Sequence, residues 1–235
     1  MHSSILRTIS VINLNQLLNK PLTVFMEQLL PGSRIEATVL PQCPEIALYL
    51  LNEDYPQHDL DQATMQRLMD EPAYWCFCWA SGQVLAKYLF DHPALVKGKT
   101  VLDFGAGSGV VAIAAALNNA AKVVACDNDK MALQACAQNA ELNKVDIDLL
   151  DDLAKNQEIF DIAIVADVLY DRDNLPLLAL LKQHAKKILV ADSRIKDFNE
   201  PGYVKSDVYH SCTIPDLNES AEFNRVTLYF SEGVF

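Results

Sequence analysis

The chain has 235 residues, of which 51% are hydrophobic, and it carries a formal net charge of -12 with a sequence pI of about 4.7. A chain of this length can bury one sizeable core, so we expect one domain with a terminal extension and no second cofactor domain. The acidic balance argues against a broad basic surface for phosphate backbones, and therefore against a nucleic-acid partner.

The six cysteines form no CxxC pair and have no histidine at metal-ligand spacing. We therefore predict neither a zinc site nor a disulfide framework, and expect the cysteines to be small buried residues. The sequence has no apolar run of 18 residues, and its first ten residues lack a basic region followed by a long apolar core. These features predict a cytoplasmic protein without membrane contact, and a monomer is the simplest expectation.

Residues 1–70 are interpreted as an N-terminal extension packed on a domain of residues 71–235. The extension contains the helical-looking LNQLLNKPLTVFMEQLL, a turn at Pro31 and Gly32, the strand-like IEATVL and the helical DQATMQRLMD. No internal repeat or low-complexity segment interrupts the chain.

From residue 100 onward, short apolar strands alternate with helical segments, which predicts an α/β fold. The expected architecture is a doubly wound, Rossmann-like sheet of seven strands, with ligands bound at the carboxyl ends of the strands. Only ten residues, 215–224, join the last two strands, too few for a helical crossover, so the last strand should be antiparallel in a mostly parallel sheet. The predicted strands are 100–104, 122–126, 146–150, 161–165, 187–191, 207–214 and 225–230, and the predicted helices are 109–119, 129–143 and 174–185.

The stretch VLDFGAGSG, residues 101–109, places a buried-type strand against a glycine-rich turn and then a helix. Gly105, Gly107 and Gly109 allow a tight turn and a close approach of backbone to a ligand. A dinucleotide-binding GxGxxG motif would need glycine where Val110 stands, and the GK[ST] of a P-loop is absent.

Asp103 lies two residues before this glycine turn. A carboxylate there would disfavour a pyrophosphate, but it would favour the cationic, amino-acid-bearing cofactor S-adenosylmethionine (AdoMet). We therefore predict an AdoMet site. The alternative is a glycine turn that serves only strand-to-helix packing.

Asp127 follows the second predicted strand, 18 residues beyond Gly109. An acidic side chain at about this distance accepts hydrogen bonds from the two hydroxyls of a nucleoside ribose. Asn128, its neighbour in the run DNDK, belongs to the same candidate cofactor site. The alternative for Asp127 is an ordinary turn residue or helix cap.

Four segments together resemble the class I, seven-strand AdoMet-dependent methyltransferases, and within them the family 16 protein-lysine methyltransferases, especially the branch that acts on the electron transfer flavoprotein beta subunit. They are CPEIALYL at 43–50, AYWCFCWASGQVLAKYLFDHP at 73–93, KTVLDFGAGSGVVAIAAA at 99–116 and ADVLYD at 166–171. The chain departs from the branch where WASG replaces the more common WPGG and DNDK replaces DIDP.

The resemblance implies that Trp79 lines the cofactor pocket. In an exposed WASGQ loop its indole face would pack on the purine or the thioether end of the cofactor, and Gly82 would give room for close approach. The alternative is that Trp79, like Trp75 and Phe77, is a core residue of a half-buried segment. The resemblance also places Asp152 where an acidic side chain accepts from the adenine amine, although a solvated turn charge is an alternative.

The expected reaction centre is Asp167 with Tyr170, just past the fourth predicted strand. It lies beside the glycine turn if that strand neighbours the first. Methyl transfer needs alignment, exclusion of water and a neutral nucleophile more than covalent help. Asp167 would orient the acceptor amine, and Tyr170 would form an aromatic wall and offer its hydroxyl. The alternative for Asp167 is a helix N-cap or a strand-end turn residue.

The resemblance implies AdoMet-dependent methylation of a lysine in a protein partner, either electron transfer flavoprotein beta subunit or a ribosomal protein. The short loops at 166–176 and 192–205 leave little material for a lid, which favours an open cleft. The alternatives are a small-molecule amine methyltransferase of the nicotinamide type and a protein that binds AdoMet without transferring its methyl group.

Overall fold

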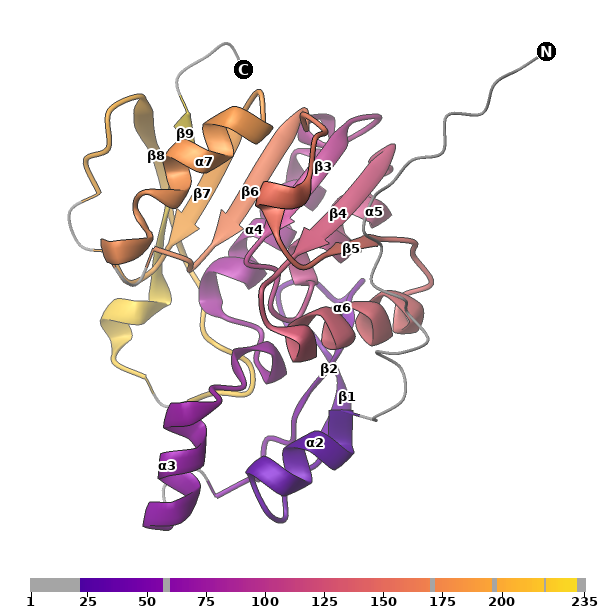
Figure 1. The fold of residues 1–235 in the computed structure, drawn as a ribbon, viewed down its shortest axis with the longest axis vertical. Coiled ribbons are helices and arrows are strands. Elements are labelled where there is room, and N and C mark those ends of the chain that lie inside the picture. Colours follow the sequence, from indigo (N-terminus) through magenta and orange to yellow (C-terminus); the bar gives the residue numbers. More distant parts are fainter. Residues whose placement is uncertain (1–21, 57–59, 170–171, 196–197, 218, 232–235) are drawn as a thin grey trace.

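Seven strands form one sheet in the computed structural model, which describes residues 22–56, 60–169, 172–195, 198–217 and 219–231 (Figure 1). Their order is β5-β4-β3-β6-β7-β9-β8. Strands β3, β4, β5, β6 and β7 are parallel to one another, and β9 is antiparallel to both of its neighbours, β7 and β8. The predicted doubly wound sheet with an antiparallel last strand is confirmed. The strands are β3 Thr100–Phe104, β4 Lys122–Cys126, β5 Asp148–Leu150, β6 Ile162–Ala166, β7 Ile188–Asp192, β8 Tyr203–His210 and β9 Arg225–Ser231.

The central strands are apolar at successive positions because helices cover both faces of the sheet. In β3, Val101 belongs to the cluster formed with α4 (Ala80–Asp91) and α5 (Val110–Leu117), whereas Leu102 belongs to the cluster formed with α7 (Leu177–His184). Both side chains are fully buried. In Figure 1, α7 lies in front of the strands and α4 and α5 lie behind them.

The order of the strands creates a crevice at the carboxyl ends of β3 and β6. The chain runs from β3 outward through β4 to β5 and then returns to form β6 on the other side of β3. Phe104 at the end of β3 is paired with Val165 of β6. The segments that follow these two strands therefore separate at a topological switch point, where open α/β sheets bind ligands.

The sixth predicted strand was misplaced by four residues. It was expected at 207–214, but β8 spans Tyr203–His210. The backbone of Ile214 instead pairs with that of Cys78, through N–H···O distances of 2.9 and 2.8 Å, and not with β9. The other predicted elements differ mainly at their ends: α5 is Val110–Leu117, α6 is Lys130–Leu142, β5 begins at Asp148, and a 3-10 turn at Arg172–Asn174 precedes α7.

The expectation that WASGQ forms an exposed loop was wrong. Ala80 begins α4, and the side chains of Ser81 and Gln83 are fully buried. A Cβ atom on Gly82 would lie 2.9 Å from Cγ1 of Val110, so this glycine allows α4 to pack closely against α5 and does not make room for a ligand. Packing against α5 overrides the low helix propensity of Gly82.

Among the described residues before residue 71, α2 and β2 pack on α6. The elements of this region are α2 Leu22–Leu29, β1 Ile35–Val39, β2 Ala47–Leu51 and α3 Gln62–Asp70. These bounds confirm the predicted strand at IEATVL and the helix in DQATMQRLMD, whereas β2 was missed and residues 1–21 lie outside the described part of the chain.

Two asparagines, one in α6 and one at its C-cap, bind the edge of β2. Asn139 Oδ1 accepts from the backbone N–H of Tyr49 at 2.7 Å, and the Asn143 side chain bonds both the N–H and the carbonyl of Ala47. Trp75, whose side chain is 1% exposed, packs in the same region as a core residue. The division into residues 1–70 and 71–235 stays a prediction.

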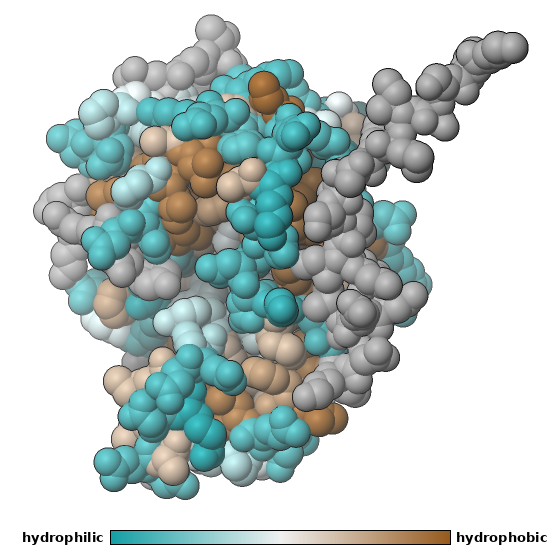
Figure 2. Space-filling model, viewed as in Figure 1, coloured by the Kyte–Doolittle hydropathy of each residue, from teal (hydrophilic) through white to brown (hydrophobic). Residues whose placement is uncertain are grey.

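On the face seen in Figure 2, hydrophobic residues gather around α7 and around the lower part of the molecule that contains α2, with hydrophilic residues between them.

Among the described residues, no helix is long and apolar enough to cross a membrane, and no cluster of three or more histidine, cysteine or acidic side chains has metal-binding geometry. All six cysteines are free thiols, and five of them are buried.

We expect Asn139→Ala to destabilise the fold by about 2 kcal/mol, because the amide of Tyr49 and the carbonyl of Ser108 would both lose a buried partner. Denaturant unfolding would measure this change. Glu141→Ala, at an exposed position of the same helix, is the matched control and should change stability by less than about 0.5 kcal/mol. Equal effects of the two substitutions would contradict a structural role for Asn139.

Candidate functional site

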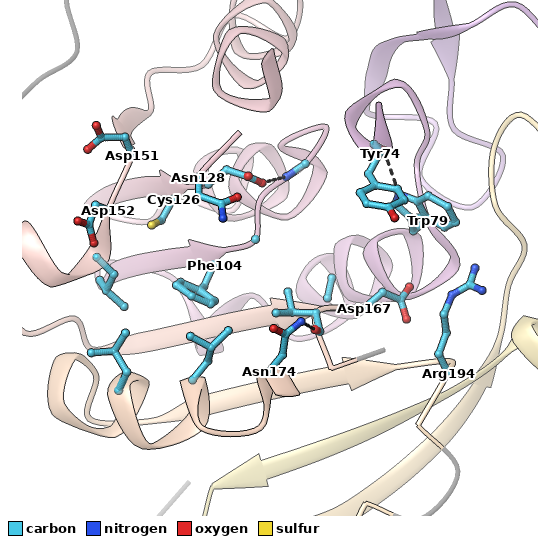
Figure 3. A pocket seen from close by; sticks show the side chains of 18 of the residues that line it. Tyr74, Trp79, Phe104, Cys126, Asn128, Asp151, Asp152, Asp167, Asn174 and Arg194 are labelled. Atoms are coloured by element: carbon cyan, nitrogen blue, oxygen red, sulfur yellow. Dashed lines mark hydrogen bonds between the residues drawn. The ribbon is translucent and has the colours of Figure 1, made fainter. Parts of the chain in front are cut away.

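A cavity of about 810 Å³ opens at the carboxyl ends of the parallel strands. Figure 3 shows Asp151 and Asp152 at one end, Asn128 near the middle, and Tyr74, Trp79, Asp167 and Arg194 at the other end. The volume falls within the range of cofactor and small-molecule sites. The cavity is lined by Tyr74, Trp79, Phe104, Gly105, Gly107, Cys126, Asp127, Asn128, Asp151, Asp152, Leu153, Lys155, Ala166, Asp167, Val168, Asn174, Leu177, Leu180, Arg194 and Glu219.

The glycine turn after β3 forms the floor of the cavity through Gly105 and Gly107. Gly105 has a φ of 72°, and a Cβ atom there would lie 2.4 Å from Cγ2 of Val168. No other residue fits this position without a shift of the segment after β6. Gly109 does not line the cavity; it adopts a φ of 78° as the N-cap of α5 and packs against Cys136 of α6.

Asp127 joins the glycine turn to the end of β4. Its Oδ2 accepts from the N–H of Gly107 and its Oδ1 from the N–H of Asp129, both at 2.9 Å. Each carboxylate oxygen therefore keeps a further lone pair that can accept from a ligand. Burial raises the pKa of Asp127, while these backbone hydrogen bonds act in the opposite direction. Asn128 is exposed at the edge of the same cavity.

Asp103 lies beneath the turn and outside the cavity lining. The residue is 1% exposed, and its Oδ2 accepts from the N–H of Ala112 at 2.9 Å. Burial raises the pKa of this carboxyl to about 7, and the charge of Asp127 adds to the shift. Asp103 thus connects β3 to the first turn of α5, and any effect on a ligand would pass through the turn.

The far end of the cavity combines acidic and apolar side chains. Asp152 caps a 3-10 turn, Leu153–Lys155, by accepting from the N–H of Ala154 at 2.9 Å. Lys155 Nζ lies 3.3 Å from Asp151 and 3.8 Å from Asp152. A flat apolar group could enter between the hydrophobic side chains of this end, which are Phe104, Cys126, Leu153, Leu177 and Leu180.

Asp167 lies at the opposite end and receives four hydrogen bonds. Ser81 donates from its hydroxyl to Oδ1 at 2.7 Å and from its backbone N–H to Oδ2 at 3.1 Å. Ser193 donates to Oδ1 from its N–H at 2.9 Å and from its hydroxyl at 2.8 Å. Because Oδ1 receives three of these bonds, Oδ2 is the oxygen that retains a free lone pair. Asp167 has a φ of 49°, and aspartate tolerates this left-handed conformation better than most residues. Tyr170, the other predicted catalytic residue, lies outside the described residues.

Trp79 is half-buried and lines the cavity beside Asp167. Its Nε1 donates to the carbonyl of Tyr74 at 2.9 Å, and the two rings meet edge to face with centroids 5.9 Å apart. Arg194 stands over the other side of the indole, with its guanidinium carbon 5.2 Å from the ring centroid.

Sequence reasoning did not find Tyr74, Arg194 or Glu219. Arg194 could have been found, because it follows β7 by two residues and the carboxyl ends of parallel strands meet at one edge. Glu219 lies in the connection between β8 and β9, whose path across the cavity depends on the pairing of Ile214 with Cys78. No local pattern in the sequence predicts the pairing of Ile214 with Cys78.

Comparison with known proteins places the chain among methyltransferases. A family model described as "Ribosomal protein L11 methyltransferase (PrmA)" matches residues 85–195. The electron transfer flavoprotein beta subunit lysine methyltransferase of Mus musculus is 39% identical over 129 residues, which cover 51% of this chain and 50% of that protein. Its counterpart in Xenopus laevis is 33% identical over 165 residues, covering 67% of this chain and 66% of that protein. The match with the mouse protein thus spans half of its length.

A solved structure has the same fold. The crystal structure of ribosomal protein L11 methylase from Lactobacillus delbrueckii subsp. bulgaricus superposes with a TM-score of 0.51 at 24% sequence identity. The superposition covers 66% of this chain and 79% of that one.

We expect Asp103→Asn to remove a pH-dependent loss of stability. The unfolded carboxyl releases its proton near its ordinary pKa of 3.8, whereas burial keeps the folded one protonated up to about pH 7. The folded state therefore binds more protons in this window, and stability falls as the pH rises through it. Melting temperatures at pH 4 to 8 should fall more steeply for the wild type than for Asp103→Asn. Asp146→Asn, at an exposed position, should follow the wild type. Parallel curves for all three proteins would contradict the prediction.

Proposed function

Because this chain carries a methyltransferase domain of the PrmA family, we propose that it binds AdoMet in the cavity and transfers the methyl group to a lysine side chain of a protein partner. The observation that carries the proposal is the gathering of Asp127, the Gly105–Gly107 turn and Asp167 around one cavity at the switch point of the sheet. The match to half the length of the mouse lysine methyltransferase supports a protein acceptor.

In this proposal the residues from Asp152 to Asp167 would hold the cofactor. The apolar side chains at the Asp152 end would hold the adenine, and Oδ2 of Asp152, which lies 3.8 Å from Lys155 Nζ, would accept from its amine. Asp127 uses the remaining lone pair on each oxygen to accept from the two ribose hydroxyls. The glycine turn passes beneath the ribose and the amino-acid part, where a side chain at Gly105 would collide with Val168. Asp103 stabilises this turn from below through its bond to Ala112.

AdoMet supplies an electrophilic methyl group on a sulfonium. The lysine nitrogen would form the new N–C bond with its lone pair, the C–S bond would break with its electron pair left on sulfur, and the nitrogen would release a proton to solvent. Presenting lysine neutral at pH 7 costs about 4 to 5 kcal/mol relative to its ordinary pKa, and desolvation near a cation lowers that cost. Asp167 orients the neutral amine by accepting one N–H at Oδ2. The role expected for Tyr170, which lies outside the described residues, stays a prediction.

The names of the relatives indicate two acceptor classes. Relatives are named for the electron transfer flavoprotein beta subunit and for ribosomal protein L11, and both acceptors are proteins. We propose the flavoprotein subunit first, because the segments at 43–50, 73–93 and 166–171 resemble that branch. Relatives of both names match about two thirds of this chain. We further propose that the protein acts as a cytoplasmic monomer and does not bind nucleic acid, in keeping with its net charge of -12.

The proposal is tested by incubating the purified protein with AdoMet labelled in the methyl group and an extract from its own organism. Label in one or a few protein bands, at lysine after hydrolysis, is the expected result. Label found only in small molecules would replace the protein acceptor with a small-molecule amine. AdoMet binding in calorimetry without any transfer would leave a binding protein and overturn the proposed reaction.

We expect Asp127→Ala to weaken AdoMet binding about 30-fold, because two hydrogen bonds to the ribose, each contributing about 1 kcal/mol, would be lost. Isothermal titration calorimetry gives this value directly. Asp146→Ala is a control at an exposed position away from the cavity and should leave the affinity unchanged. An Asp127→Ala affinity within twofold of the wild type would exclude the ribose contact.

We expect Asp167→Ala to keep AdoMet affinity within about threefold and to lower methyl transfer by about 100-fold or more, because the acceptor amine would lose its alignment. Ser193→Ala is the matched control, since it removes a hydroxyl donor to Asp167 but keeps the carboxylate. Single-turnover transfer should be slow in the first variant and near normal in the second. Wild-type transfer by Asp167→Ala would show that the reaction centre lies elsewhere.

A further inference from the structure

The end of the cavity beyond Asp167 contains an ion pair held in a fixed position. Arg194 Nη2 donates to Glu219 Oε1, and Glu219 Oε2 accepts from the hydroxyl of Thr213 at 2.7 Å. The side chains of Arg194 and Glu219 are only 23% and 17% exposed, so this pair is part of the cavity wall and not a surface contact.

Two aromatic rings contact the guanidinium of Arg194, and a hydrogen bond holds its backbone. The guanidinium carbon lies 5.2 Å from the ring centroid of Trp79 and 4.5 Å from that of Phe223. Its backbone N–H donates to the buried carboxylate of Asp192 at 2.7 Å. A guanidinium held by stacking and by a carboxylate loses little additional freedom on pairing. Arg194 therefore positions Glu219 and is not itself available as a mobile cation.

Glu219 retains acceptor capacity toward the cavity. A carboxylate has about four lone-pair sites, and the two donors, Arg194 and Thr213, use one on each oxygen. The described charged residues that line this end are Asp167, Glu219 and Arg194, which sum to one negative charge. One entering monovalent cation neutralises that charge. An anionic group, or a second cation, leaves a net charge in a partly desolvated site, which is unfavourable.

We propose that Glu219 is an acceptor-specificity residue, which binds the ammonium of the incoming lysine at the end of the cavity opposite Asp152, with Arg194 as its positioning residue. This inference rests on the proposed function, because it requires that the methyl acceptor be a lysine side chain. Glu219 draws the charged amine in before deprotonation. Asp167, at the same end of the cavity, then orients the neutral amine toward the methyl group.

The experiment measures AdoMet-dependent labelling of the protein bands that the wild-type enzyme labels in extract of its own organism, with acceptor and salt concentrations varied. Glu219→Gln keeps the shape of the side chain but removes its charge, and leaves Arg194 uncompensated. We expect the apparent KM for the acceptor to rise about tenfold or more, with kcat within about threefold and AdoMet affinity within about twofold of the wild type. Added salt should raise the acceptor KM of the wild type more than that of Glu219→Gln, because screening weakens an attraction that the variant lacks.

Two further variants distinguish the effect of losing the Glu219 charge from an effect of impaired folding. Glu219→Asp keeps the carboxylate with a shorter reach and should recover part of the acceptor affinity. Glu222→Gln removes an exposed charge of the same segment outside the cavity lining and should behave as the wild type. Melting temperatures identify any variant that fails to fold.

The outcomes distinguish this inference from the function on which it rests. Wild-type transfer with an unchanged acceptor KM in Glu219→Gln overturns the role of Glu219 and leaves the function standing. A loss of AdoMet affinity equal to the loss of acceptor affinity also overturns it, because Glu219 would then contact the cofactor. The absence of transfer to any protein by the wild-type enzyme overturns the proposed function itself.

Discussion

The carboxylate of Asp167 holds together the three segments that form one end of the cavity. Its four hydrogen bonds join the end of β6 to the first turn of α4 through Ser81, and to the end of β7 through Ser193. The same interactions offset the cost of a left-handed backbone at a residue that is not glycine. Without this carboxylate, the serine hydroxyls and two backbone amides would be left without an acceptor in a part-buried region. The position of Trp79, which immediately precedes α4, depends on the same arrangement.

The central sheet could be predicted from the sequence because each of its strands is a local signal. Buried parallel strands are short apolar runs, and the glycine turn after Phe104 requires backbone conformations that glycine adopts at little cost. The positions of Asp127 and Asp167 at strand ends followed from this pattern alone. That these two residues lie near each other in space can be predicted from the rule that the carboxyl ends of parallel strands lie at one edge of the sheet.

The parts that the sequence did not reveal depend on contacts between distant segments. An exposed loop was expected at the start of α4, yet Gly82, which has a low helix propensity, is the residue that lets α4 approach Val110. The end of β8 was misplaced because Ile214 pairs with Cys78 and does not continue along β9. Glu219, which follows in the same connection, lines the cavity. In each case the deciding contact joins residues that are far apart in the sequence, and no periodic pattern of hydrophobic residues predicts such a contact.

The two ends of the cavity differ in how their charges are balanced. At the Asp152 end, Lys155 lies within 4 Å of two carboxylates, and apolar side chains complete the wall. At the Asp167 end, the guanidinium of Arg194 contacts two aromatic rings and pairs with Glu219, and the one cation with two carboxylates leaves one net negative charge. A flat, neutral base suits the first end and a single cation suits the second. This asymmetry favours a cofactor bound in one direction only. Its reactive end would then face the place where a cationic acceptor is most stable.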